Sequence, residues 1–119
     1  MLQKTSAALY KGERVPNKRR TILVLCSDFV IRRLNRQYRG KDKATDVLSF
    51  TFGDPDLLGE IYISLQRARV QARKYQLSYE QEIKRLFVHG FLHLLGHDHY
   101  KVEEREAMES RERFYLDKP

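Results

Sequence analysis

All four histidines of this 119-residue chain lie within eleven residues, from His89 to His99. His89 and His93 are four residues apart, so on a helix their imidazoles lie one turn apart on the same face and can reach one metal ion. Gly96 follows three residues later and predicts that the helix ends there through a left-handed residue. The chain can then turn back and bring His99 to the ion from a third direction. This spacing predicts a metal site formed by His89, His93 and His99.

Three neutral nitrogen ligands without a cysteine leave one coordination position open, which is typical of catalytic rather than structural zinc sites. We therefore expect one zinc ion per chain, held by three histidines and a water. His97 is the alternative third ligand, but it follows the predicted turn after one residue, which is early for a chain reversal. At the rim of the pocket it would instead contact substrate. Asp98 is a candidate partner for a ring N–H of a ligand histidine.

The spacing of the histidines and the glycine matches that of the metzincin peptidases, with one difference. Those enzymes have a glutamate general base directly after the first histidine, whereas this chain has Gly90. Loss of such a base typically lowers the rate by a factor of about 10²–10⁴. Peptide hydrolysis is therefore disfavoured, whereas other chemistry of metal-activated water is not.

The charge balance of the chain favours a polyanionic partner. There are 23 Lys and Arg against 16 Asp and Glu, a formal net charge of +7. Such a balance favours nucleic acid above all, although many small proteins are basic for solubility alone. The single cysteine, Cys26, fits a reducing compartment and is expected as a small buried residue rather than a nucleophile. With no visible signal peptide and no membrane-spanning apolar run, the sequence predicts a soluble, cytoplasmic protein.

The hydrophobic pattern predicts a single α+β domain over residues 1–119, a small mixed sheet packed with helices. Strands are expected at 21–26, 47–52 and 59–64, the last two as antiparallel neighbours, and helices at 28–39, 64–76, 79–95 and 102–116. The segment 1–20 is expected as a short helix or an irregular arm. In the helix at 64–76, we expect Tyr75 to face inward.

The helix at 79–95 is expected to be the central, zincin-like helix that carries the metal site. Ser78 and Gln81 predict a capping box at its start. Its broad apolar face predicts the core, and His89 and His93 lie at the edge of that face. The residues of the apolar face are Ile83, Leu86, Phe87, Gly90, Phe91 and Leu94.

Arg39 ends the helix at 28–39 beside Gly40, from where it is able to reach a cleft and hold a phosphate bidentately. Composition alone favours an ordinary surface arginine instead.

Three blocks of the chain, 34–50, 59–64 and 89–99, resemble the YbeY family of rRNA maturation factors in order and spacing. The resemblance implies a zinc-dependent endoribonuclease that prefers single strands. It also implies a role in 16S rRNA 3′-end maturation and ribosome quality control, with RNA and the small ribosomal subunit as partners. The family's metal ligands correspond to His89, His93 and His99, and its catalytic arginine corresponds to Arg39. Two departures are His97, where a tyrosine is common, and the short segment before Thr21, which predicts that the family's N-terminal helix is shortened or absent.

The mechanism expected from these residues is cleavage of an RNA phosphodiester at zinc, with Arg39 neutralising the phosphate. The attacking group is either a zinc-activated water or the RNA 2′-OH, and the sequence does not indicate which residue is the general base. Two alternatives remain open: a zinc hydrolase of another substrate, such as a divergent peptidase, and a ribosome- or RNA-binding factor with a structural metal.

Overall fold

The computed structural model describes residues 2–97 and 101–117. These residues form an α+β domain with a small mixed sheet, which confirms the predicted class. The elements are α1 (Gln3–Gly12), β1 (Arg20–Cys26), α2 (Asp28–Arg39), β2 (Val47–Phe50), β3 (Leu57–Ser64), α3 (Leu65–Lys74), α4 (Tyr79–Leu94) and α5 (Val102–Leu116). Among the described residues, no helix is both long and apolar enough to cross a membrane.

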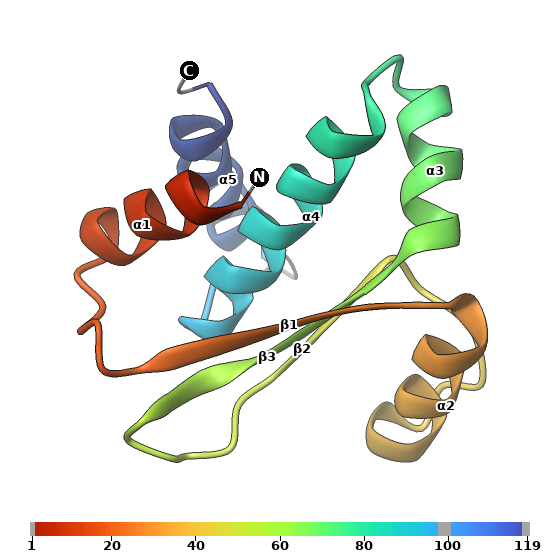
Figure 1. Cartoon of the computed structure of the whole chain (residues 1–119), viewed down its shortest axis with the longest axis horizontal. Coiled ribbons are helices and arrows are strands. Elements are labelled where there is room, and N and C mark those ends of the chain that lie inside the picture. Colours follow the sequence, from red (N-terminus) through yellow and green to blue (C-terminus); the bar gives the residue numbers. More distant parts are fainter. Residues whose placement is uncertain (1, 98–100, 118–119) are drawn as a thin grey trace.

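The three strands are ordered β1-β3-β2, so β3 is the central strand. β1 runs parallel to β3, whereas β2 pairs with β3 in the antiparallel direction, as the sequence predicts. Four helices, α1, α3, α4 and α5, lie on one face of the sheet, and α2 lies on the other side at one end (Figure 1). The sheet is therefore covered unequally on its two faces.

The core lies between the sheet and α4. Ile61 and Ile63 of β3 are fully buried against this helix, and so are Val88 and Phe91 of α4 itself. All six residues of the predicted apolar face of α4 are buried. The prediction of a central helix is confirmed, and α4 holds the candidate metal ligands on a well-packed element.

Local sequence signals set most of the helix ends. The predicted capping box opens α4: the Gln81 amide donates to Ser78 Oγ at 3.0 Å, and the Ser78 amide donates to Gln81 Oε1 at 2.8 Å. Gly40 ends α2 in the left-handed conformation, with φ of 69°. α3 ends at Lys74, so Tyr75 caps the helix and is 51% exposed. The expected inward position of Tyr75 is wrong because the helix ends before it.

The second strand is shorter than predicted. β2 ends at Phe50, which is paired with Glu60 of β3. Thr51 and Phe52 lie beyond this last pair, exposed in the connection to the turn at Gly53, whose φ is 70°. The prediction extended the strand to residue 52 because Thr51 and Phe52 have high β-propensity, whereas in the structure the strand ends where its pairing with β3 ends.

A short helix, α1, precedes the first strand, so of the two forms expected for residues 1–20 the structure has the short helix. Leu9 of α1 is fully buried, and the Tyr10 ring packs against Phe91 of α4 with centroids 5.4 Å apart. The Tyr10 hydroxyl donates to the carbonyl of Arg19 at 2.6 Å. These tertiary contacts stabilise a segment whose sequence pattern is weak.

Cys26 ends β1 and is partly exposed, with Sγ 3.6 Å from the carbonyl oxygen of Ile63. Burial and the neighbouring charge of Asp28 raise the pKa of its thiol. A raised pKa disfavours the thiolate, which agrees with the prediction that Cys26 is not a nucleophile.

Candidate metal centre

His89 and His93 lie one turn apart on α4, half-buried, with their rings in an edge-to-face arrangement. The ring centroids are 4.7 Å apart, and the two Nε2 atoms are 3.2 Å apart. Two ligands at about 2.0–2.1 Å from a tetrahedral zinc ion are separated by about 3.3 Å. The two Nε2 atoms are therefore spaced as ligands of one ion, so this part of the site fits zinc.

The outer nitrogen of His89 contacts a carboxylate from another helix. Glu112 of α5 places Oε1 2.6 Å from His89 Nδ1, and its side chain is 15% exposed. A carboxylate at Nδ1 favours the tautomer with the proton on Nδ1, which leaves the Nε2 lone pair for a metal. Sequence reasoning missed Glu112 because a contact between two helices leaves no signature in residue spacing. The candidate that it named instead, Asp98, lies outside the described residues.

Glu82 and Arg85 of α4 form an ion pair near Glu112. Glu82 is fully buried, and both its carboxylate oxygens accept hydrogen bonds of 2.7 Å from Arg85. The hydrogen bond with Glu82 raises the pKa of Arg85, and the nearby charges of Asp46 and Glu112 raise it further. Arg85 therefore lies near enough to Glu112, the carboxylate that contacts His89, for their charges to interact.

The helix ends where the sequence predicts. Gly96 has φ of 92°, its amide donates to the carbonyl of His93, and the His97 amide donates to the carbonyl of Leu92. This pair of bonds is a Schellman motif, which reverses the chain after α4. His99 follows the reversal but lies outside the described residues. Among residues 2–97 and 101–117, no group of three side chains is placed to hold a metal, so the third ligand stays a prediction.

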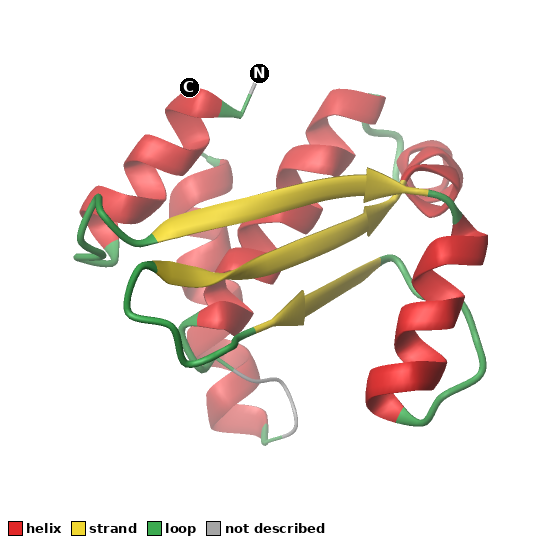
Figure 2. Ribbon diagram, turned by 60° about the horizontal axis from the view of Figure 1, so that its bottom comes forward, coloured by secondary structure: helices red, strands yellow, loops and turns green. Residues whose placement is uncertain are grey.

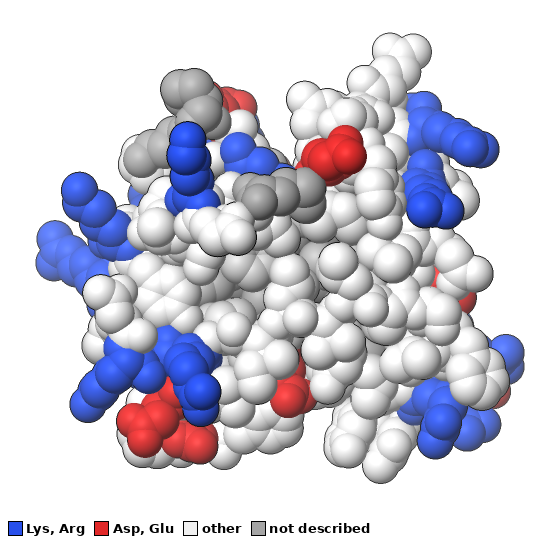
Figure 3. Space-filling model, viewed as in Figure 1, with Lys and Arg blue, Asp and Glu red and all other residues white. Residues whose placement is uncertain are grey.

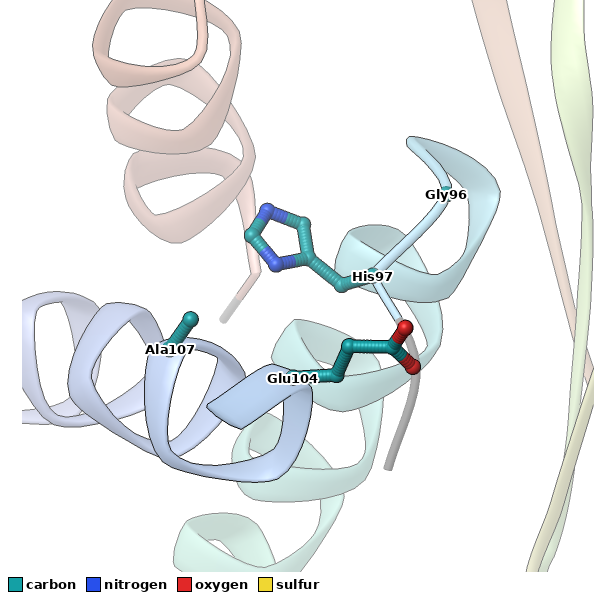
Figure 4. Close-up of a pocket in the computed structure, with 4 residues that line it drawn as sticks. All are labelled: Gly96, His97, Glu104 and Ala107. Carbon is teal, nitrogen blue, oxygen red and sulfur yellow. The ribbon is translucent and has the colours of Figure 1, made fainter. Parts of the chain in front are cut away.

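His97 points away from the sheet, toward the carboxylate of Glu13 (Figure 4). Its ring points away from the strands beside a pocket of about 280 Å³, which is lined by Gly96, His97, Glu104 and Ala107 (Figure 4). His97 Nε2 lies 3.8 Å from Glu13 Oε1. This contact gives His97 a role in joining the loop to the end of α1.

Glu13 is the centre of a polar cluster between α1 and α5. It accepts a hydrogen bond from Arg111 Nε at 3.1 Å and another from the hydroxyl of Tyr115, whose side chain is buried. Burial raises the pKa of Glu13, but the hydrogen bonds from Tyr115 and Arg111 and the charge of Arg111 outweigh it. The net result is a lowered pKa. The ionised form of Glu13 therefore stabilises the fold.

We expect Glu13→Gln to lower the free energy of unfolding at pH 7 by about 1–3 kcal/mol, because two donors lose a charged acceptor. The lowered pKa gives stability that is complete above the unfolded value, about pH 4.3, and is lost as pH falls through the folded value. Thermal melts between pH 7 and pH 3 should therefore show a smaller acid loss in Glu13→Gln than in the parent. Equal acid losses in the parent, in Glu13→Gln and in the exposed control Glu109→Gln would contradict this role.

Gly90, the residue at the position of the peptidase base, faces the sheet. A Cβ atom there would lie 2.8 Å from Cγ2 of Ile61, 3.0 Å from Oγ of Ser49 and 3.2 Å from Cγ2 of Val47. The glycine allows the close approach of α4 to β2 and β3. A glutamate at this position has no room, which counts against a peptidase site.

Arg39 lies at the edge strand next to this contact. Its Nη2 donates to the carbonyl of Ser49 at 2.6 Å, and its guanidinium lies 5.1 Å from the ring centroid of Phe50. Ser49 Oγ in turn donates to the carbonyl of Gly90, the neighbour of His89, at 2.9 Å. Ser49 thus joins Arg39 to the helix that carries the candidate ligands His89 and His93, although Arg39 itself is exposed.

The chain is similar to a known protein family over its whole length. The family described as Endoribonuclease YbeY matches residues 1–119. A relative of that name from Solibacter usitatus is 53% identical over 97 residues, which cover 81% of this chain and 65% of the relative. Another, from Carboxydothermus hydrogenoformans, is 47% identical over 93 residues, which cover 76% of this chain and 65% of the relative. The chain therefore spans slightly less than two thirds of the length of these two relatives.

A more distant sequence and a solved structure match more of the chain. Endoribonuclease YbeY of Bacillus subtilis is 39% identical over 118 residues, which cover 88% of this chain and 75% of the relative. The solution structure of TM1509 from Thermotoga maritima matches with a TM-score of 0.68 and 29% identity, covering 98% of this chain and 79% of that one.

Proposed function

Since the chain belongs to the YbeY endoribonuclease family, we propose that it is a zinc-dependent endoribonuclease of single-stranded RNA. The observation that carries the metal part is the pair of Nε2 atoms 3.2 Å apart on one face of α4. The name of the family supports RNA as the substrate, and the net charge of +7 suits it. From the family resemblance we further propose 16S rRNA 3′-end maturation and ribosome quality control, in the cytoplasm.

In this proposal His89, His93 and His99 hold one zinc ion, and Glu112 orients His89 through Nδ1. Bound zinc supplies Lewis-acid chemistry, which polarises a phosphoryl oxygen or activates water near neutral pH. The rigid α4 keeps the two described imidazoles at ligand spacing before the metal binds. Pre-organised ligands of this kind lower the cost of assembling a site.

Arg39 is proposed to bind the phosphate next to the cleaved bond. Its guanidinium is planar and always charged, and is able to contact two phosphate oxygens at once. Its hydrogen bond to Ser49 fixes it at the edge of β2, and Ser49 fixes this edge to α4 beside His89. Phosphate binding by Arg39 thus places RNA at the strand that packs against the metal helix.

The attacking group can be identified from the products. Attack by the RNA 2′-OH leaves a 2′,3′-cyclic phosphate, whereas attack by water leaves a linear monoester. Mass spectrometry of the cleaved ends distinguishes the two.

A substrate panel tests the function against its two alternatives. We expect the zinc-loaded protein to cut single-stranded RNA, to cut duplex RNA much more slowly and to leave casein intact. Cleavage of casein with intact RNA would favour a peptidase. No cleavage of any substrate, together with a large loss of thermal stability on chelation, would favour a binding factor with a structural metal.

We expect Glu112→Gln to weaken zinc affinity by about 10- to 100-fold, because the carboxylate that orients His89 is lost. Competition with a chromophoric chelator measures this affinity without reference to activity. Glu109→Gln is the matched control, since Glu109 is an exposed glutamate of the same helix. Equal zinc affinity in the two variants would show that Glu112 does not position the ligand.

A further inference from the structure

Over most of one face of the sheet lies none of the described helices, and the side chains of this face are exposed or partly exposed. Ile61 and Ile63 of β3 face α4, so the alternate residues of the three strands lie on the opposite face. Figure 2 shows this face in front of the strands, with α2 beside one end and the other helices behind. We call it the bare face and define it by its two cross-strand rows, which are Ile22, Glu60 and Phe50, and Val24, Tyr62 and Leu48.

Aromatic rings line the bare face on the side of α2. Phe50 packs edge-on against Tyr38 of α2, with centroids 5.5 Å apart, and against Tyr62, with centroids 5.9 Å apart. Tyr38 is 61% exposed and Ile22 is 43% exposed. The three rings form one continuous run, in which Tyr38 of α2 is exposed and Phe50 and Tyr62 of the sheet are partly exposed. Apolar surface that is gathered in this way, rather than scattered singly, is a candidate binding site.

Positive charge lies beside these rings. α2 carries four arginines and a single acidic residue, Asp28. Arg39 lies over the ring of Phe50, and Arg36 is exposed one turn before it. Arg32 is the exception, because it is paired with Asp42 at 2.9 Å. An arginine rim beside exposed rings complements the charge of a nucleic acid strand.

The negative charge of Glu60 limits where the phosphates of a bound nucleic acid strand could lie on the bare face. It accepts a hydrogen bond of 2.9 Å from the Tyr62 hydroxyl and places a negative charge in the first row. Phosphates are repelled there and attracted to α2, so the bases rather than the backbone would lie over the rings.

We propose that the bare face stacks the bases of single-stranded RNA, with the phosphates along the arginines of α2. Single-stranded RNA is commonly bound in this way, by aromatic side chains on a sheet and a basic groove for the backbone. Arg39 connects the two regions, since it lies over Phe50 and also bonds to Ser49, the residue joined to α4. The inference rests on the proposed function and names a surface for the RNA that flanks the cleaved bond.

The chain has no tryptophan, so a single introduced tryptophan reports base stacking. We expect the fluorescence of Tyr38→Trp, in the His93→Ala background that prevents cleavage, to be quenched by a short single-stranded oligoadenylate. Tyr75→Trp is the matched control: Tyr75 is 51% exposed beside Lys74 and Arg85, but it caps α3 on the other side of the sheet. Quenching of Tyr75→Trp alone, or of both equally, would overturn the proposal.

Affinity gives an independent readout. In the same background, Tyr38→Ala should weaken oligoadenylate binding by about 5- to 100-fold, the range expected for one stacked base. Tyr38→Phe should bind like the parent, and Tyr75→Ala should change affinity by less than about twofold. Circular dichroism melts verify that each variant is folded.

The outcomes separate this inference from the function on which it rests. If the parent cleaves an RNA that Tyr38→Ala binds with the same affinity as the parent, the proposed RNA-binding role of the bare face is overturned and the proposed nuclease function is retained. A parent that neither binds nor cleaves single-stranded RNA would overturn both. If the bare face binds a protein partner instead of RNA, the parent cleaves RNA and Tyr38→Ala binds it with unchanged affinity.

Discussion

Replacing His93 by alanine should abolish stoichiometric zinc binding and RNA cleavage together. The variant removes one of the two candidate Nε2 ligands in the described part of the chain, and the remaining imidazoles are too few for a stable catalytic zinc site. Lewis-acid stabilisation is worth several kcal/mol, so we expect the cleavage rate to fall by at least about 10³-fold. Metal analysis of the purified variant and a single-turnover assay on labelled RNA measure the two effects.

The other histidines of the block are informative controls for this variant. His99→Ala should behave like His93→Ala, whereas His97→Ala should retain one zinc per chain because the His97 ring faces Glu13. Zinc loss in His97→Ala with zinc retained in His99→Ala would reassign the third ligand. Full cleavage by metal-free His93→Ala would contradict the proposed chemistry.

Gly90→Glu, which restores the residue that peptidases of similar spacing use as a base, should unfold the protein rather than create a peptidase. A Cβ atom alone would contact Ile61, Ser49 and Val47 below ordinary distances, and the glutamate would bury an unpaired charge against the sheet. We expect a loss of at least about 4 kcal/mol, a large part of the stability of a typical domain. Urea unfolding followed by circular dichroism measures this loss.

Gly90→Ala gives a measurable version of the same effect. One added methyl group should cost about 1–3 kcal/mol, because the close approach of α4 to β2 and β3 must widen. A folded Gly90→Glu variant with casein-cleaving activity would contradict the steric account and revive the peptidase alternative.

The elements near His89 and His93 were predictable because their sequence signals are local. The four-residue spacing of His89 and His93, the capping box at Ser78 and the left-handed glycine at Gly96 all act within one or two turns of the chain. The structure confirms the helix, its start and its end. It leaves His99 untested, since that residue lies outside the described part of the chain.

The features that the sequence could not predict depend on contacts between distant segments. Glu112 is 23 residues from His89, and Glu13 is 98 residues from Arg111. α1 has a weak pattern of its own and is stabilised by burial of Leu9 against the core. Arg39 was predicted as a phosphate ligand, but its position over Phe50 at the strand edge became visible only in three dimensions.

The most direct test of the central claim is a zinc titration of the chelated protein, with the initial rate of single-stranded RNA cleavage measured at each step. We expect the rate to rise with bound zinc and to saturate at one equivalent per chain, while His93→Ala stays at background throughout. Cleavage that is complete before zinc is added, or that does not change as one equivalent binds, would contradict a zinc-dependent endoribonuclease.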